Sequence, residues 1–317
     1  MTEKTTTPSD AEIERAASLL RSGGLVAFPT ETVYGLGANA LDSAAVDRIF
    51  EAKGRPSTSP LIVHVSSIHM AQLIVAEWPS DAELLARRFW PGPLTLVLKK
   101  HAKISARVTA GLDTVGIRVP AHPTALALLR AAGVPVAAPS ANRFGSISPT
   151  RAEHVSASLG ERVDMILNGG ATEVGIESTV LSVASDYPIL LRPGMISREQ
   201  IEAMIGPVSV DSVTPAAGGH VSPGMHARHY SPATRLVLVG PRDALPAGHG
   251  AYVCISMPRS AGRVIVMPDT PDQYAAALYR TLHELDAEHL DWIAVEIPPD
   301  APAWFAIHDR LMRAASR

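Results

Sequence analysis

The 317-residue chain has one cysteine, few aromatic residues and no run of about 18 apolar residues. A single cysteine cannot form a disulfide within the chain, so we expect a reducing compartment, with Cys254 as a small buried residue in an apolar run. The amino terminus has no apolar core of a signal peptide. These absences predict a cytoplasmic protein without membrane contact.

The chain also has little excess charge. Lys and Arg number 28 against 31 Asp and Glu, a net charge of -3, so bulk attraction to nucleic acid or anionic membranes is not expected. Hydrophobic residues make up 46% and aromatic residues 5%, which indicates a globular protein with cores of Ala, Val, Leu and Ile. The length favours two domains.

Several common catalytic motifs are missing. The sequence has no G-x-x-x-x-G-K-[ST] loop, no H-E-x-x-H, no paired C-x-x-C and no G-x-S-x-G. Residues 35–40 match the dinucleotide pattern G-x-G-x-x-A, but six residues separate them from the preceding predicted strand, so the pattern does not indicate a dinucleotide site. The chemistry must therefore rest on other residues.

Apolar periodicity predicts a mixed α/β sheet followed by a small parallel α/β domain. The predicted domains are 10–205 and 233–317, joined by a linker or active-site loop over 206–232 that is rich in Gly, Pro, Ser and Ala. Helices are predicted over 10–22, 43–53, 67–76, 80–88, 123–132, 150–158, 197–205, 271–287 and 303–315. Strands are predicted over 25–28, 61–65, 94–98, 115–119, 134–137, 165–167, 179–183, 189–191, 235–239, 252–255, 264–267 and 292–297.

Polar residues gather at the predicted strand ends, where a rigid sheet can present binding groups. Residues 28–35 carry threonine hydroxyls that suit an amino-acid or carbonate ligand, although an ordinary turn is an equal alternative. Lys53 and Arg55, with three nearby hydroxyls, suit a polyphosphate, against the alternative of a solvated basic loop. His64 lies in an apolar strand, where a core histidine is the simpler interpretation. Arg118 alternates with apolar residues and is suited either to a ligand carboxylate or to a structural salt bridge.

Taken in order, these segments and several others resemble the YrdC domain family, in its longer form with an additional carboxy-terminal domain. The resemblance covers about 10–205 and resumes at 222–232, which is similar to the family's interdomain loop. The motifs that carry it are 28–37, 53–56, 60–64, 90–95, 119–123, 138–142 and 191–194.

The resemblance implies a YrdC-like twisted sheet and the roles of individual residues. Lys53 and Arg55 would be catalytic. L-Threonine and its carbamate would be held by Thr32, His64, Arg118, Ala138 through its backbone, and Ser178. The nucleotide would be held by Lys53, Arg55, Ser59, Thr114, Ser140, Asn142, Ser148, Arg192 and Tyr230.

The implied reaction is ATP-dependent synthesis of threonylcarbamoyl-AMP from L-threonine and bicarbonate or CO2, with release of pyrophosphate. The product would pass to a tRNA threonylcarbamoyl transferase for modification of A37, and Mg²⁺ would be carried by ATP rather than by protein side chains. Such a transfer can rest on positioning and charge neutralisation, which agrees with the missing nucleophile motifs.

Three alternatives stay open at this point. Lys53 and Arg55 also suit an RNA-binding module without catalysis, and direct tRNA binding is left undecided. The second alternative is a carbamoyl-transfer protein for metal-centre maturation, although the zinc-finger and acylphosphatase-like parts of that family are missing here. His226 and His229 have a spacing that fits metal ligands, but we favour a loop that closes over the product.

Overall fold

The fold is described from a computed structural model, which describes residues 7–210, 229–256, 259 and 261–316. The helices are α1 (Asp10–Arg21), α2 (Ser43–Lys53), α3 (Ile68–Gln72), α4 (Ser80–Phe89), α5 (Ala106–Thr109), α6 (Pro123–Ala132), α7 (Ala152–Leu159), α8 (Arg198–Ile205), α9 (Pro271–Asp286) and α10 (Phe305–Ala315), with 3-10 turns η1 (Gly160–Arg162) and η2 (Pro302–Trp304). The strands are β1 (Val26–Pro29), β2 (Tyr34–Asn39), β3 (Ile62–His64), β4 (Leu94–Lys99), β5 (Thr114–Arg118), β6 (Val136–Ala137), β7 (Met165–Ile166), β8 (Thr179–Ser182), β9 (Ile189–Arg192), β10 (Ser209–Val210), β11 (Arg235–Val239), β12 (Gly250–Cys254), β13 (Arg263–Val266) and β14 (Trp292–Glu296).

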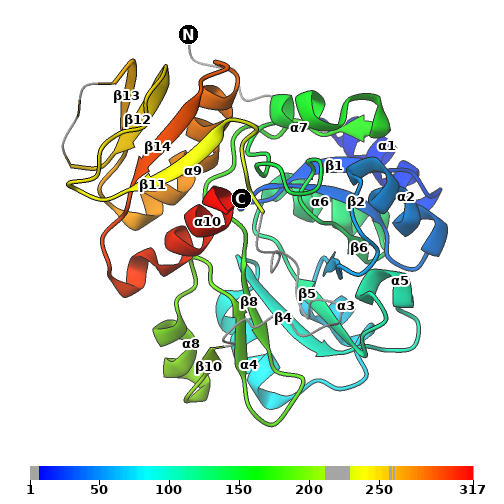
Figure 1. Cartoon of the computed structure of the whole chain (residues 1–317). Helices are drawn as coiled ribbons and strands as arrows, with labels where there is room; N and C mark the ends of the chain where they lie inside the picture. Colours follow the sequence, from blue (N-terminus) through cyan, green and yellow to red (C-terminus); the bar gives the residue numbers. More distant parts are fainter. Residues whose placement is uncertain (1–6, 211–228, 257–258, 260, 317) are drawn as a thin grey trace.

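Among the described residues the strands form two sheets (Figure 1). The larger sheet has the order β10-β9-β8-β4-β5-β3-β6-β2-β1-β7 and mixes parallel pairs such as β3 with β5 and antiparallel pairs such as β1 with β2. The smaller sheet has the order β11-β14-β12-β13, and all its pairs are parallel. Both sheet types agree with the prediction from the sequence.

The larger sheet is covered by helices on both faces, as the alternation of side chains along β1 illustrates. Val26 and Phe28 point into the core formed with α1 and α6, whereas Ala27 points into the core that contains Ile49 of α2. Because neighbouring side chains of a strand lie on opposite faces, a continuous apolar segment predicts this doubly buried position. Helix α1 begins with a capping box, in which Ser9 and Glu12 bond each other's backbone N–H groups.

Three elements were not predicted from the sequence. The sequence predicts no strand over 34–39, but these residues form β2, whose Gly37 lies against Phe28 and Val136 without room for a side chain. Helix α5 is a single short turn. Strand β10 pairs with β9 in the larger sheet, which therefore extends beyond residue 205, the predicted end of the first domain.

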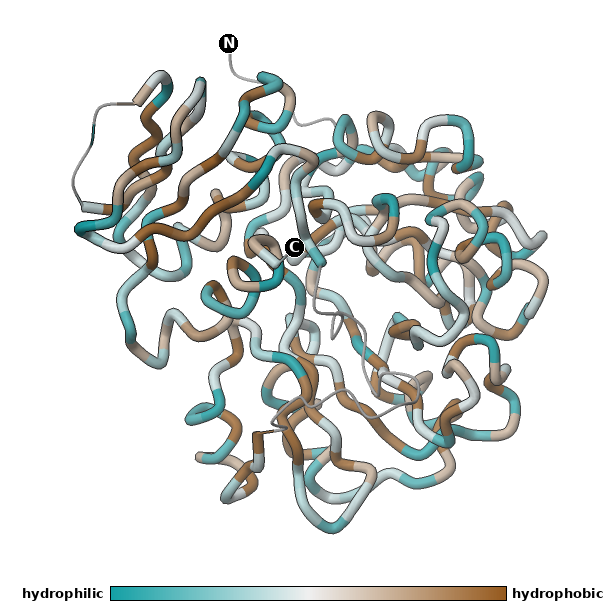
Figure 2. The backbone as a smooth tube through the Cα atoms, viewed as in Figure 1, coloured by the Kyte–Doolittle hydropathy of each residue, from teal (hydrophilic) through white to brown (hydrophobic). Residues whose placement is uncertain are grey.

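In the described part of the chain, the smaller sheet has helices on one of its two faces. Apolar residues of α9 and α10 pack on the face that presents Val253 and Ile293, and Cys254 is buried on the other face with 1% exposure. Figure 2 shows the hydrophobic stretches along β11 and β14. Within the described ranges, no helix combines the length and apolar character needed to cross a bilayer.

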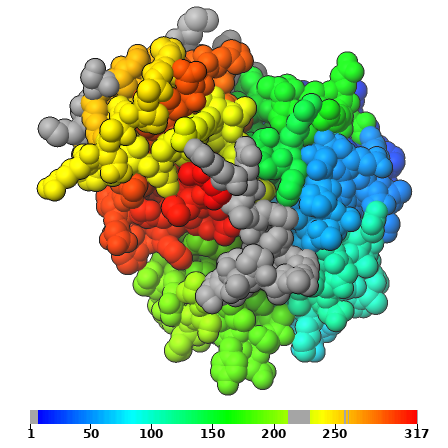
Figure 3. Space-filling view, viewed as in Figure 1, coloured from blue at the N-terminus to red at the C-terminus, as the bar shows by residue number. Residues whose placement is uncertain are grey.

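The second domain packs closely on the first. Val33, Ile147 and Ile176 of the larger domain belong to the same buried apolar cluster as α9 and α10. Gly175 has a φ of +80°, and a side chain there would overlap the backbone of Ala275 in α9. Figure 3 shows the yellow-to-red carboxy-terminal part in direct contact with the green part of the larger domain. The two domains thus share an apolar interface.

Candidate functional site

A hollow that is partly open to solvent lies at the strand ends of the larger domain, beside the carboxy-terminal domain. It brings together nine of the residues predicted from the sequence: Thr32, Arg55, His64, Arg118, Ala138, Ser140, Ser178, Arg192 and Tyr230.

Thr32 and Arg118 form one wall of the hollow. Thr32 lies in the loop between β1 and β2, where its hydroxyl contacts that of Thr30 at 2.8 Å and accepts from the Arg118 guanidinium at 3.0 Å. Arg118, at the end of β5, also donates to Gly92 O and pairs with Glu31 at 2.7 Å. Both charged side chains are almost fully buried. Arg118 therefore makes the structural salt bridge that the sequence allowed and still faces the hollow.

His64 lies beside Arg118, because β3 and β5 pair in the register that places these two residues opposite each other. It is 4% exposed, and its Nδ1 atom has no hydrogen-bond partner. Burial and the Arg118 charge lower the pKa of His64 to about 3, so the ring is neutral near pH 7. A neutral imidazole in this place can accept or donate a hydrogen bond but does not add positive charge.

Lys53 does not line the hollow but supports one of its walls. Its ammonium group, at the end of α2, donates to the backbone oxygens of Ser140 at 2.6 Å and Asn142 at 2.5 Å. Burial and the neighbouring Arg55 guanidinium hold the pKa of Lys53 well below its ordinary value. In this structure Lys53 fixes the loop that carries Ser140.

Arg55 faces the hollow with little compensation from the protein. It donates to Pro60 O at 3.1 Å and lies over the Phe144 ring at 5.6 Å, and its Nε atom is buried without a partner. Burial lowers the pKa of Arg55 to about 10, and the Arg192 charge adds to this effect. Because Arg55 is a buried cation that pairs with no carboxylate in the described part of the chain, it is a strong candidate to bind an anionic group.

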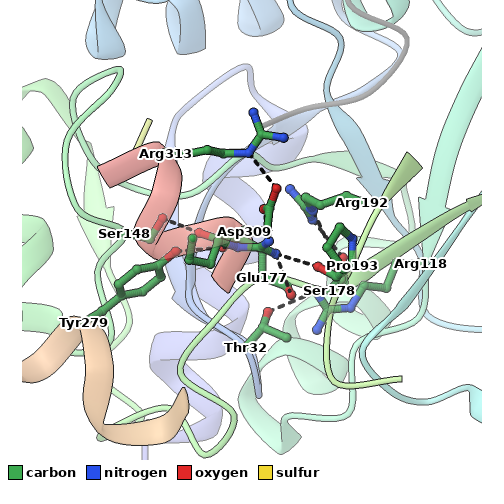
Figure 4. Close-up of polar contacts among 11 residues, drawn as sticks. Thr32, Arg118, Ser148, Glu177, Ser178, Arg192, Pro193, Tyr279, Asp309 and Arg313 are labelled. Atoms are coloured by element: carbon green, nitrogen blue, oxygen red, sulfur yellow. Dashed lines mark hydrogen bonds and ion pairs between the residues drawn. The ribbon is translucent and has the colours of Figure 1, made fainter. Parts of the chain in front are cut away.

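Ser178 and Arg192 also line the hollow and lie on neighbouring strand ends (Figure 4). Arg192 donates to the Ser178 hydroxyl and to its carbonyl, each at 3.1 Å, and the hydroxyl also contacts Thr95 at 2.8 Å. Ser148 does not line the hollow, because its hydroxyl donates to Glu177 at 2.5 Å.

Tyr230 follows the linker and lies at the domain boundary with 1% exposure. Its φ of 61° lies in the left-handed region, which is unusual for a bulky residue. Stacking on Tyr279 at 5.9 Å and an edge contact with His229 at 4.1 Å hold the ring. Residues 211–228, which contain His226 and most of the predicted loop, lie outside the described residues.

The remaining predicted residues lie outside the hollow. Ser59 is buried in the turn after α2, and the Asn142 side chain bonds the backbone of the following loop. Thr114, at the start of β5, lines a different and smaller hollow with Thr95 and Val180. The structure thus does not group Thr114 with Arg55 and Arg192. Ala138 does line the site, but its N–H donates to Ile62 O at 2.9 Å, so a ligand contact would use the carbonyl.

The sequence analysis missed two carboxylates. Glu31, in the same loop as Thr32, compensates Arg118, and Glu177, next to Ser178, lines the hollow. Glu31 lies within the motif 28–37 and Glu177 precedes the predicted residue Ser178, but local sequence gives no sign of the distant arginines that neutralise them.

Comparisons with known proteins extend across the chain. Residues 18–194 match the Sua5–YciO–YrdC family, described as "Telomere recombination", and residues 196–316 match the family "Threonylcarbamoyl-AMP synthase, C-terminal domain". A threonylcarbamoyl-AMP synthase of Bacillus subtilis is 46% identical, covering 97% of this chain and 94% of that protein. A threonylcarbamoyl-AMP synthase of Pyrococcus abyssi is 42% identical, covering 96% of this chain and 94% of that protein.

The crystal structure of P. abyssi Sua5 complexed with L-threonine superimposes with a TM-score of 0.91 at 41% identity. The match covers 97% of this chain and 95% of that one, so both domains and their arrangement are shared. The chain therefore belongs to the Sua5–YciO–YrdC family, in the threonylcarbamoyl-AMP synthase form that carries the additional carboxy-terminal domain.

Proposed function

We propose that this chain is an ATP-dependent nucleotidyltransferase that makes threonylcarbamoyl-AMP and pyrophosphate from L-threonine, bicarbonate and ATP. The observation that carries the proposal is one hollow that is lined by the hydroxyl residues Thr32 and Ser178 and by the cation of Arg55. Relatives named for this activity, and a relative crystallised with L-threonine, support it. The comparisons favour this enzyme over an RNA-binding module without catalysis.

In the proposed reaction the threonine nitrogen adds to the carbon of bicarbonate, and water leaves to give a carbamate. A carbamate oxygen then attacks the α-phosphorus of ATP, and the bond to the pyrophosphate oxygen breaks. No covalent enzyme intermediate is needed, so the contribution of the protein is to orient the groups and stabilise the charge.

The side chains divide this work by their charge. Arg55 and Arg192 provide positive charge for the phosphates, and Lys53 holds the loop that carries Ser140. Thr32, Arg118 and Ser178 offer hydrogen bonds to the amino acid and its carbamate. Neutral His64 adds a hydrogen-bonding atom without competing for the phosphates.

We propose that Mg²⁺ enters with ATP as part of the substrate. Within the described part of the chain, no group of three or more His, Cys, Asp or Glu side chains is placed to share a metal ion. The two carboxylates at the hollow, Glu31 and Glu177, are each paired with an arginine. This donor set does not suit a protein-bound metal, whereas a triphosphate and water supply the oxygens that Mg²⁺ prefers.

The product contains a mixed anhydride that water can hydrolyse, so we further propose that it passes to a tRNA threonylcarbamoyl transferase in the cytoplasm. The experiment that tests the function measures pyrophosphate release from ATP with L-threonine and bicarbonate each omitted in turn. Release that needs both is the expected result. Pyrophosphate release that continues when L-threonine or bicarbonate is omitted would contradict the proposal. Salt-dependent RNA binding with no ATP turnover would also contradict it.

A further inference from the structure

Among the described residues, the largest fully buried side chain is a charged one. Arg310, on α10, has 0% exposure. Its guanidinium bonds to the larger domain rather than to solvent. A fully buried cation is costly unless it is paired and hydrogen-bonded, so its contacts indicate why it is there.

Every contact of Arg310 with the larger domain reaches a segment beside the hollow. Its Nε atom donates to the Glu177 carboxylate at 2.8 Å. Its Nη2 atom donates to Pro193 O at 3.0 Å and to Glu177 O at 3.4 Å. Within its own helix it pairs with Asp309 at 2.6 Å.

Glu177 collects hydrogen bonds from both domains (Figure 4). Ser148 donates to one carboxylate oxygen at 2.5 Å, and Tyr279 of α9 donates to the other at 3.0 Å. Burial alone would raise the pKa of Glu177, but the charges of Arg310 and Arg192 outweigh burial and lower it. Glu177 is therefore an anion near pH 7, held by three side chains.

The residues that Arg310 fixes are direct neighbours of predicted substrate-binding groups. Glu177 precedes Ser178, and Pro193 follows Arg192, so the two strand ends of one wall of the hollow are each bonded to the same guanidinium. Arg310 also lies over the ring of Tyr230 at 5.2 Å, which lines the hollow from the linker side. One side chain thus contacts three segments of the site without lining it.

We propose that Arg310 is a positioning residue through which the carboxy-terminal domain completes the active site of the larger domain. It fixes the strand ends that carry Ser178 and Arg192, together with the Tyr230 ring. This inference rests on the proposed function, because it assigns Arg310 a part in binding the substrates of that reaction. A buried ion pair that served only to join the domains would not need to contact both strand ends and the linker.

The test compares steady-state pyrophosphate release by the parent and by Arg310→Met, Arg310→Lys and Glu177→Gln. We expect Arg310→Met to raise the KM for L-threonine and for ATP and to lower kcat/KM at least tenfold. Arg310→Lys should recover part of this loss, because it restores the charge but not the forked hydrogen bonds. The double variant Arg310→Met with Glu177→Gln should lose little more than Arg310→Met alone, because the two residues act as one unit.

Two controls separate positioning from stability. Ile307→Ala removes a buried contact one turn earlier in α10 and should lower the thermal unfolding midpoint while leaving both KM values as in the parent. Arg280→Met, on the exposed side of α9, removes an arginine and should leave the kinetics unchanged.

Parent-like KM values in folded Arg310→Met would overturn the proposal, and so would an equal rise of KM in Ile307→Ala. If Arg310→Met does not fold, the KM values of Glu177→Gln are compared with those of the parent instead, since this substitution keeps the shape of the side chain. Failure of the proposed function is distinguishable, because the parent would then lack threonine-dependent pyrophosphate release.

Discussion

His64 provides a sharp test of the electrostatics of the hollow. Its pKa changes from an ordinary 6.5 to about 3 because of burial and the Arg118 charge. Between these two values the unfolded chain binds one more proton than the folded chain, so the free energy of unfolding falls as the pH falls from 6.5 towards 3. Because only 4% of the His64 surface is exposed in the folded chain, contact with solvent does little to offset the lowering of its pKa.

The magnitude follows from the two pKa values. At pH 4.5 protonation of His64 stabilises the unfolded chain by about 3 kcal/mol, against almost nothing at pH 7. The parent should therefore lose about 2–3 kcal/mol more stability between these pH values than His64→Gln. This difference hardly depends on the folded-state value as long as that pKa stays below about 4.

The assay is urea unfolding at pH 7 and pH 4.5, followed by tryptophan fluorescence, for the parent and His64→Gln. The change with pH is compared, not the absolute stability, because glutamine also alters packing. His69→Gln, an exposed histidine on α3, controls for the loss of one imidazole and should follow the parent. Equal losses of stability in the parent and His64→Gln would refute the assignment of a buried, neutral His64.

Three further outcomes are expected. Arg55→Ala should lower pyrophosphate release at least tenfold, about 1.4 kcal/mol at the barrier, with unchanged circular dichroism; a parent-like rate would remove Arg55 from the phosphate site. Glu31→Gln leaves Arg118 buried without its carboxylate and should lower the free energy of unfolding by about 3–5 kcal/mol in urea titrations, whereas a neutral effect would mean that Arg118 is compensated elsewhere. Gly175→Ala should weaken domain packing and lower the melting temperature by several degrees, since a side chain there meets the α9 backbone; Gly111→Ala, at a similar φ but in open space, should cost only about 1 kcal/mol, and equal effects would contradict the packing argument.

Local sequence predicted most of the secondary structure because the determining interactions are short-range. Ser9 and Glu12 begin α1, Gly54 ends α2 and Gly133 ends α6, each through contacts within a few residues. Strand β2 was missed because Gly35 and Gly37 have low strand propensity. Their place in the sheet depends on the close approach of Phe28 and Val136 from other strands.

The candidate site was predicted in part. Threonine, histidine and arginine residues at strand ends indicated a ligand pocket, and the hollow contains Thr32, Arg55, His64 and Arg118. The sequence did not show that Lys53 turns to backbone oxygens, because that depends on where a loop some 90 residues later passes over it.

The sequence by itself determined the order of helices and strands, the two sheet types and the kinds of polar side chain at the strand ends, since spacing and local propensity encode these. Only the tertiary structure decided which charges compensate one another: Glu31 with Arg118, and Glu177 with Arg310 across the domain boundary. Charge pairing in a buried site depends on distances of a few ångströms between residues far apart in the chain. The folding of both domains around the hollow sets those distances, and local sequence does not record them.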